Sequence, residues 1–208
     1  MTERASCGDA AFISSVEGFD TFPHIVRLIA RGQPVDIDEL ASLVQRSPDE
    51  VERALRAQSG TEWDVEGRLV GFGLSLRPTE HRFTVAGRTL YTWCATDTLL
   101  FTVILGADTV AESTCPTTHQ PIRVDLTPDA LVSVAPPEAV VSQRHAGALA
   151  GELRTEVCDH GHFYASAAAA GRWAGEHPEG EVLSVADAFG RCRTTCEELG
   201  WIPEVTSR

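Results

Sequence analysis

A thiol and a carboxyl stand three residues apart at the start of a strongly apolar segment. Residues Thr98 to Leu105 are almost entirely apolar and Gly106 ends the run, as in a buried helix closed by a glycine. Cys94 and Asp97 would share one face at the N-terminus of that helix. There the helix dipole favours a thiolate, and the neighbouring carboxyl can hold or deliver a proton. The pair predicts a reactive site; the alternative is a buried, unreactive cysteine beside an aspartate that caps the helix.

A second group of chemically active side chains alternates along residues 157–166. Cys158, His160 and His162 are separated by single residues, so a β-strand would place all three on one face. Thiol and imidazole groups in that arrangement can ligate a metal ion. They can equally be the hydrogen-bonded groups of a half-buried strand. The spacing leaves both interpretations open.

The other cysteines show none of the common metal-binding spacings. The chain has six cysteines and no C-x-x-C pair, which excludes the usual zinc-ribbon and thioredoxin patterns. We expect free thiols in a reducing cytosol. Cys115 opens a turn that lacks a second cysteine, so we expect a structural residue. Cys192 and Cys196 lie four residues apart on a predicted helix, where a disulfide would be strained. No function is predicted for these two or for Cys7.

Three short amphipathic helices and a β-hairpin are predicted within residues 23–80. The first helix begins at Pro23, the second at an Asp36 cap, and the third at a capping box that starts with Ser47. A hairpin that turns at Glu66-Gly67 follows. Together these elements form the pattern of a winged-helix-like domain.

Residues 81–208 are predicted to form a second domain, which contains the candidate reactive residues, and residues 1–22 an N-terminal arm. Strand patterns occupy 82–92 (two strands around Ala86-Gly87), 108–114, 122–126, 131–134, 139–141, 157–166 and 182–184. Helical patterns outside the apolar segment occupy 146–154, 166–176 and 184–199. The predicted fold class is therefore α+β, a three-helix winged-helix-like unit followed by a core of mixed β-sheet and helices.

The composition limits the possible partners. The 208 residues are 43% hydrophobic, the net charge is −13, and all 17 basic residues are arginines. Binding to nucleic acid requires a basic surface, yet residues 1–80 contain eight arginines against fourteen acidic residues. We therefore expect no nucleic-acid partner. The longest apolar run is too short to cross a bilayer and the N-terminus is polar, so we expect a soluble, cytoplasmic protein.

Two motifs resemble those of a known enzyme family. They are Leu90-Tyr91-x-Trp93-Cys94-Ala95-x-Asp97-Thr98-Leu99 and Cys158-x-His160-x-His162-Phe163-x-Ala165-Ser166. Shorter similarities occur at residues 30–35, 61–67, 71–77, 113–115 and 185–190. Over about residues 23–190 the chain resembles the organomercurial (alkylmercury) lyases.

The resemblance implies a reaction and a set of site residues. The reaction is protonolysis of the carbon–mercury bond of alkyl or aryl mercurials, which detoxifies them to a hydrocarbon and Hg(II). The implied catalytic residues, which also hold mercury, are Cys94, Asp97 and Cys158. Trp93 would line the substrate pocket, and Cys115 would be structural. The winged-helix-like domain would not bind DNA, and residues 81–208 would form the catalytic domain.

This chemistry agrees with general principles. Mercury is a soft cation that prefers thiolates, and a second thiolate on mercury increases the electron density on carbon. A proton must then reach that carbon, which requires an acid such as Asp97. No organic cofactor is required; Hg(II) is bound as the product. The implied partners are the organomercurial substrate, cytosolic thiols, and a mercuric reductase that accepts Hg(II).

One position departs from the family pattern, and other functions remain open. Many members have a second cysteine directly after the catalytic one, where this chain has Asp159. This puts in doubt an auxiliary thiol that passes Hg(II) onward. The main alternative is a thiol-based mercury or metal-binding protein without turnover, which would need no Asp97. A metal-responsive winged-helix regulator and a zinc site at Cys158, His160 and His162 are further alternatives.

Overall fold

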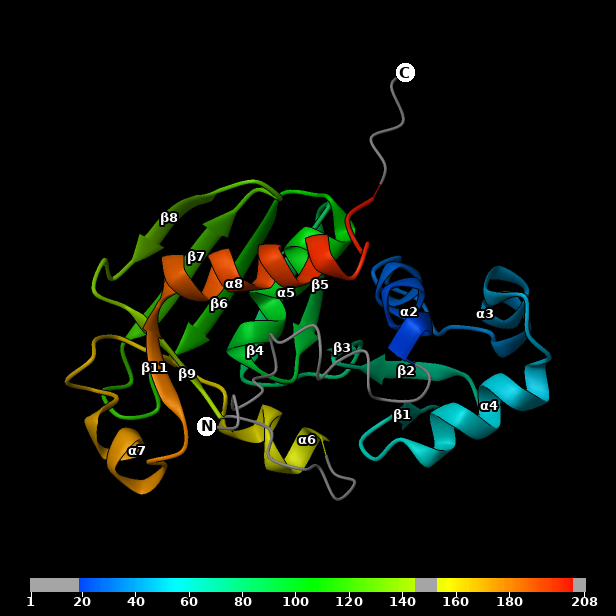
Figure 1. Cartoon of the computed structure of the whole chain (residues 1–208), viewed down its shortest axis with the longest axis horizontal. Coiled ribbons are helices and arrows are strands. Elements are labelled where there is room, and N and C mark those ends of the chain that lie inside the picture. Colours follow the sequence, from blue (N-terminus) through cyan, green and yellow to red (C-terminus); the bar gives the residue numbers. More distant parts are fainter. Residues whose placement is uncertain (1–18, 145–152, 204–208) are drawn as a thin grey trace.

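The computed structural model describes residues 19–144 and 153–203, which form an α+β fold (Figure 1). Residues 1–18 of the predicted N-terminal arm, with Cys7, and most of the predicted 146–154 helix lie outside these residues. The remainder of the predicted arm, residues 19–22, forms a 3-10 turn and the start of the first helix. An eight-stranded antiparallel sheet has the order β1-β2-β3-β5-β4-β6-β7-β8, and a three-stranded sheet has the order β10-β9-β11. The mixed architecture predicted from the sequence is confirmed.

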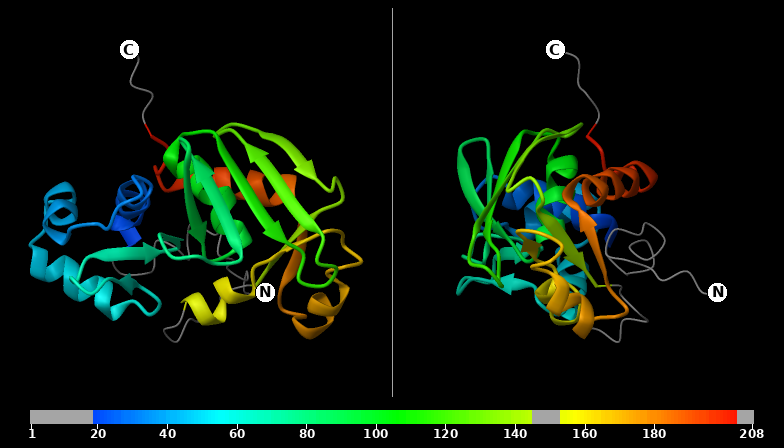
Figure 2. Two further views of the ribbon diagram at one scale, coloured as in Figure 1. Left: turned by 180° about the vertical axis from the view of Figure 1, so that it is seen from behind. Right: turned by 90° about the vertical axis from the view of Figure 1, so that its left-hand side faces the viewer.

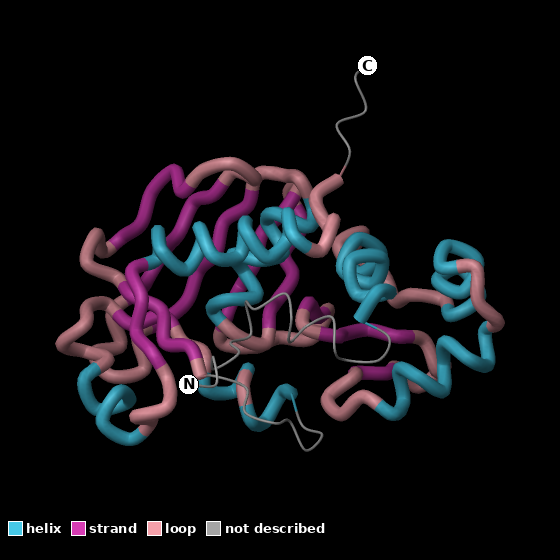
Figure 3. The backbone as a smooth tube through the Cα atoms, in the orientation of Figure 1, coloured by secondary structure: helices cyan, strands magenta, loops and turns pink. Residues whose placement is uncertain are grey.

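The N-terminal unit contains three helices and a hairpin, and it lies at one end of the molecule (right in Figure 3). Its elements are the 3-10 turn η1 (Phe19–Thr21), α2 (Phe22–Ile29), α3 (Ile37–Val44), α4 (Pro48–Ala57), β1 (Glu62–Trp63) and β2 (Leu69–Phe72). The predicted caps form, because Asp36 accepts a hydrogen bond from the backbone of Asp38 and Ser47 forms a capping box with Glu50. These local signals set the helix starts as predicted.

The other strands of the large sheet continue directly from the hairpin. They are β3 (Leu74–Ser75), β4 (His81–Val85), β5 (Arg88–Thr92), β6 (Thr109–Thr114), β7 (Pro121–Leu126) and β8 (Leu131–Ala135). Strand β3 pairs with β2 on one side and with β5 on the other. The N-terminal hairpin and the C-terminal strands therefore share one sheet, and the domain boundary near residue 80 stays a prediction.

The strands in the middle of this sheet, β4, β6 and β7, bury mainly one face. In β4 the buried residues His81, Phe83 and Val85 alternate with the exposed Arg82 and the half-buried Thr84. This period of two is typical of an antiparallel sheet that packs on one side. Two helices lie on the buried side, α5 (Ala95–Leu105) and α8 (Val185–Glu198), as the edge-on view in Figure 2 shows.

Helix α5 is the centre of the core. Every residue from Ala95 to Ile104 is buried, and Gly106 closes the helix in the left-handed conformation with φ 60°. This confirms the helix predicted from the apolar run. Helix α8 packs along α5, and it begins at the predicted Ser184 cap, whose side chain accepts a hydrogen bond from the backbone of Asp187.

The small sheet and its connections hold the second motif. The elements are β9 (Val140–Gln143), α6 (Leu153–Glu156), the 3-10 turn η2 (Cys158–His160), β10 (Phe163–Tyr164), α7 (Gly171–Glu176) and β11 (Glu181–Ser184). The prediction of one strand over residues 157–166 is wrong. The backbone N–H of Gly161 donates a hydrogen bond to the carbonyl of Cys158, which closes a turn. The carbonyl of Gly161 accepts a hydrogen bond from the backbone N–H of Ala95. Contacts outside the segment therefore replace strand pairing.

One smaller correction follows from local hydrogen bonds. The helix predicted over 166–176 begins only at Gly171, because Ser166 closes a turn by accepting from the backbone of Ala169 and Ala170.

No helix among the described residues is both long enough and apolar enough to cross a membrane.

Candidate active site

The first cysteine lies at the junction of β5 and the buried helix α5. Cys94 is the N-cap residue of α5, and its Sγ accepts a hydrogen bond from the backbone N–H of Asp97 at 3.4 Å. In return, Asp97 Oδ2 accepts from the backbone N–H of Cys94 at 3.2 Å. The thiol and the carboxyl are therefore held side by side in a reciprocal capping box. The two interpretations of this pair, a helix cap and a reactive site, are compatible.

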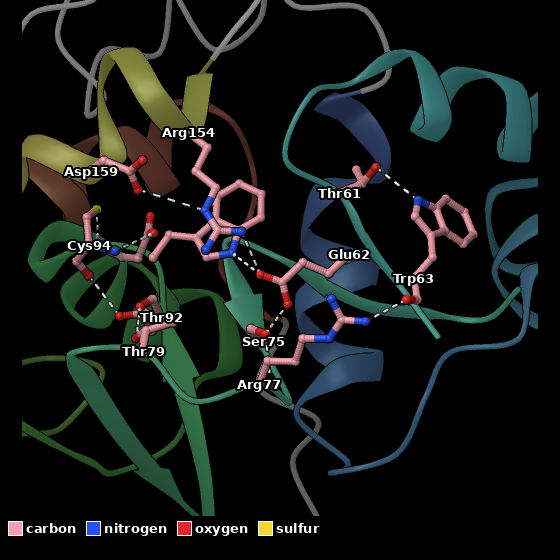
Figure 4. A network of polar contacts seen from close by, with 12 residues as sticks. Thr61, Glu62, Trp63, Ser75, Arg77, Thr79, Thr92, Cys94, Arg154 and Asp159 are labelled. Atoms are coloured by element: carbon pink, nitrogen blue, oxygen red, sulfur yellow. Dashed lines mark hydrogen bonds and ion pairs between the residues drawn. The ribbon is translucent and has the colours of Figure 1, made fainter. Parts of the chain in front are cut away.

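Two threonines hold the junction in place. The hydroxyl of Thr92 donates to the carbonyl of Cys94 at 2.8 Å, and the hydroxyl of Thr79 donates to the carbonyl of Thr92 at 2.6 Å (Figure 4). Trp93 donates its backbone N–H to the carbonyl of Gly73. Because these backbone groups before α5 are engaged in hydrogen bonds, Cys94 has little freedom to move.

The second cysteine reaches the same place through the η2 turn. The carbonyl of Gly161 accepts from the N–H of Ala95 at 2.9 Å, which joins the η2 segment to the first residue of α5. Gly161 allows this close approach, since a Cβ there would lie only 2.9 Å from the Cβ of Cys94. The ligand atoms of Cys94, Asp97 and Cys158 all lie within 4.8 Å of one another, and all three residues are buried.

Burial changes the acid strength of this carboxyl. Loss of solvent raises the pKa of Asp97 from 3.8 to about 6, although hydrogen bonds from Cys94 and from the backbone of Cys94 and Trp93 oppose the shift. Burial disfavours the charged carboxylate, which explains the direction. About one-tenth of the carboxyls then carry a proton at neutral pH, so Asp97 can both accept and donate a proton.

Trp93 is fixed beside the cluster by two charged residues from distant parts of the chain. Its Nε1 donates to Glu62 at 3.1 Å, and the guanidinium of Arg154 lies 4.8 Å from the centre of its ring. Arg154 also donates to Glu62 at 2.7 Å and lies 3.8 Å from Asp159. The N-terminal hairpin, Trp93 and the segment that carries Cys158 are therefore joined by one polar network.

Comparison with known proteins decides the family. A family model described as alkylmercury lyase matches residues 74–196, and a model of the helix-turn-helix domain of alkylmercury lyase matches residues 19–73. The alkylmercury lyase of Streptomyces lividans is 43% identical over 175 residues, which cover 84% of this chain and 81% of that protein. The alkylmercury lyase of Bacillus cereus is 42% identical over 168 residues, 81% of this chain and 77% of that protein. The chain belongs to the alkylmercury lyase family.

A solved structure supports the same fold. The mercury-bound form of MerB2 superposes with a TM-score of 0.76 and covers 91% of this chain and 96% of that chain at 23% identity. The alkylmercury lyases are enzymes, and the family reaction is protonolysis of the carbon–mercury bond. The resemblance inferred from the two motifs is confirmed.

The other described cysteines of this chain lie outside the cluster. Cys115 is buried in a turn; burial raises its pKa, but hydrogen bonds from Thr118 and other residues outweigh that effect and lower it. Cys192 packs against α5, with its Sγ 4.0 Å from the carbonyl of Thr96. Burial raises the pKa of Cys196 to about 12. These thiols form no disulfide.

The two histidines of the second motif point to different places in the fold. His160 lies near His177, with ring centres 5.0 Å apart and the rings tilted, whereas His162 lies near His81. Cys158 joins Cys94 instead. Among the described residues, Cys158, His160 and His162 therefore form no common ligand cluster, because the η2 turn points them in different directions.

Glu62 and Arg154 were not predicted as site residues. Glu62 was expected only as part of a hairpin strand, yet it is 7% exposed and also accepts from the Ser75 hydroxyl at 2.5 Å. Gly71 makes room for it, since a Cβ there would lie 2.6 Å from a Glu62 oxygen. The sequence signal that could indicate a buried Glu62 is a glycine at the facing position of the hairpin, Gly71. The burial itself depends on α6 and on Trp93, which the hairpin sequence does not specify.

Proposed function

We propose that Cys94, Cys158 and Asp97 carry out the family reaction in this chain. The observation that supports this is the convergence of two thiols and one carboxyl within 4.8 Å in a buried site. One mercury atom can contact both sulfur atoms at that spacing. Proximity of this kind converts a reaction between separate molecules into one within a single complex.

The first step is capture of the mercurial. Cys94 displaces a small thiol from R–Hg, so that a bond forms between mercury and Cys94 Sγ, and the released thiolate takes up the proton that Cys94 loses. Soft mercury prefers this sulfur to oxygen or nitrogen ligands. The product of this step is R–Hg–S–Cys94.

The second step breaks the carbon–mercury bond. Asp97 accepts the proton of the Cys158 thiol, and the Cys158 thiolate adds to mercury. Asp97 then delivers the same proton to carbon as the carbon–mercury bond breaks, and its carboxylate is regenerated. The hydrocarbon leaves and Hg(II) remains on two thiolates. A pKa of about 6 suits this exchange, since a shuttle works best when its pKa lies near the operating pH.

Trp93 lines the pocket for the organic group in this proposal. Its buried ring lies next to the nucleophile in sequence and is held by Glu62 and Arg154. An indole face suits an apolar alkyl or aryl substituent. The same contacts exclude water from the protonation step.

The partners follow from the product. Hg(II) on two thiolates leaves by exchange with other thiols, so we propose cytosolic thiols and a mercuric reductase as acceptors and the cytoplasm as the location. Asp159 supplies a carboxylate where many relatives have a second cysteine, and it lies 3.8 Å from Arg154. Transfer of Hg(II) in this chain would then rely on external thiols. No resident cofactor takes part in these steps.

Headspace analysis tests this function directly. The purified chain is incubated with methylmercury or phenylmercury and excess small thiol, and methane or benzene is measured. We expect many turnovers by the wild type and none by Cys158→Ala. Cys192→Ala, which removes a buried thiol outside the cluster, is the matched control and should retain turnover. Stoichiometric mercury binding without hydrocarbon would refute the proposal and favour a sequestering protein.

A further inference from the structure

A second cluster of ligand-type side chains lies outside the thiol site. Glu80 precedes β4, His81 begins β4, and His162 follows the η2 turn. One ligand atom from each of the three residues lies within 4.8 Å of the others. None of them takes part in the steps proposed above.

His81 is held in a fixed orientation inside the protein. It is 3% exposed, and its Nδ1 lies 3.0 Å from the hydroxyl of Ser113. That hydroxyl also donates to the backbone carbonyl of Glu80 at 3.3 Å. Burial, with a smaller effect of His162, lowers the pKa of His81 to about 3, which the carbonyl of Gly161 only partly offsets. The contact with Ser113 holds His81 so that one ring nitrogen lies within 4.8 Å of the ligand atoms of Glu80 and His162.

His162 presents a nitrogen without a hydrogen bond. Its Nδ1 is buried and has no hydrogen-bond partner among the described residues. The nearest charge is Glu80 Oε2 at 3.7 Å. A buried polar atom without a hydrogen-bond partner is unfavourable, and a bound ion would give this nitrogen a partner.

We propose that Glu80, His81 and His162 bind a divalent metal ion of the Zn²⁺ type. Two imidazoles and a carboxylate are a common ligand set for Zn²⁺, with bonds of about 2.0–2.2 Å. Ligand atoms around such an ion are roughly 3.3 Å apart, so the His162–Glu80 distance of 3.7 Å needs only a small closure. Glu80 can supply it, because its side chain is 75% exposed.

The ligand chemistry keeps this ion apart from the substrate. Mercury selects the thiolates of Cys94 and Cys158, whereas imidazole and carboxylate groups suit harder, borderline cations. The bound ion would join β4 to the segment that carries Cys158. Gly161 of this segment packs against Cys94, so the ion would hold the second thiol in register with the first without entering the reaction.

Cobalt binding by a full-length variant tests the site. Cys94→Ser/Cys158→Ser removes the competing thiol cluster, and Co²⁺ is titrated while its visible absorption is recorded. We expect one Co²⁺ per chain, no sulfur-to-cobalt charge-transfer band, and displacement by Zn²⁺. Adding Glu80→Gln or His162→Gln should weaken binding by about tenfold or more. Glu138→Gln, at another exposed glutamate, is the control and should leave the affinity unchanged.

Three outcomes would overturn the proposal. They are no Co²⁺ binding by the double-serine variant, a charge-transfer band that assigns the ion to another cysteine, and an affinity insensitive to both Glu80→Gln and His162→Gln. Glu80 is exposed, so a folding defect cannot account for a loss of binding in its variant. Circular dichroism of the His162→Gln variant verifies its fold.

Discussion

Replacing Asp97 with asparagine should stabilise the protein and abolish its turnover. The folded state binds the Asp97 proton more tightly than the unfolded chain, because burial raises the pKa from 3.8 to about 6. The ionised side chain is thus an unfavourable group in the core at neutral pH. Asparagine keeps the shape and an oxygen that can accept from the Cys94 backbone, but it carries no charge and no transferable proton.

The size of the effect follows from the shift. The pKa of Asp97 rises from 3.8 in the unfolded chain to about 6 in the folded protein. At about 1.4 kcal/mol per pKa unit, this shift corresponds to a change of about 3 kcal/mol in the free energy of unfolding. The stability that the raised pKa contributes is fully present below about pH 3.8 and is lost as the pH rises through about 6. The stability of Asp97→Asn relative to wild type should therefore increase by about 3 kcal/mol over this range.

Urea unfolding across this pH range measures the difference. Both proteins are unfolded under reducing conditions between about pH 4 and pH 8, with tryptophan fluorescence as the signal. Asp125→Asn is the control, because hydrogen bonds from Ser133 and Arg123 lower the pKa of Asp125. The stability of this variant relative to wild type should therefore fall, rather than rise, as the pH increases. A stability difference between Asp97→Asn and wild type that does not change with pH would refute the argument, since Asp97 would then not be the raised carboxyl that the proton transfer requires. Hydrocarbon release by Asp97→Asn would refute it independently.

Two further substitutions test how the site is held. Glu62→Gln should lower the free energy of unfolding by about 1–3 kcal/mol and raise the KM for mercurials, because it weakens the polar network around the pocket. Urea unfolding measures the first effect and headspace kinetics the second, with Glu138→Gln as the control. An unchanged free energy of unfolding and an unchanged KM would contradict this prediction. Gly161→Ala should lower turnover by roughly tenfold or more, because its Cβ would lie 2.9 Å from the Cβ of Cys94. Gly175→Ala, where a Cβ meets no atom within 4 Å, should behave as wild type, and equal turnover by both variants would show that the close approach is not needed.

Local sequence signals determined the elements with strong boundaries. The Ser47 capping box, the helix ending at Gly106 and the hairpin around Ala86-Gly87 all form as predicted. Each depends on residues only a few positions apart, so the physical cause is contained in a short stretch of chain. The proximity of Cys94 and Asp97 belongs to this class, since helix geometry alone places i and i+3 on one face.

Contacts between distant segments decided the rest of the site. The alternation at residues 157–166 predicted a strand, but the carbonyls of Gly161 and His162 accept hydrogen bonds from Ala95 and Ser142 instead. These bonds depend on where α5 and β9 lie, which no local pattern specifies. The turn separates Cys158 from His162. Cys158 lies with Cys94 and Asp97, whereas His162 lies with Glu80 and His81.

The sequence alone therefore determined the fold class and the family, because residue types and short spacings encode them. Tertiary structure decided the surroundings of the proposed site residues. Glu62 meets Arg154 across 92 positions of the chain, and the pKa of Asp97 rises because packing around α5 removes its solvent. Desolvation and long-range ion pairing are properties of the assembled core, so they emerge only when the whole chain is folded.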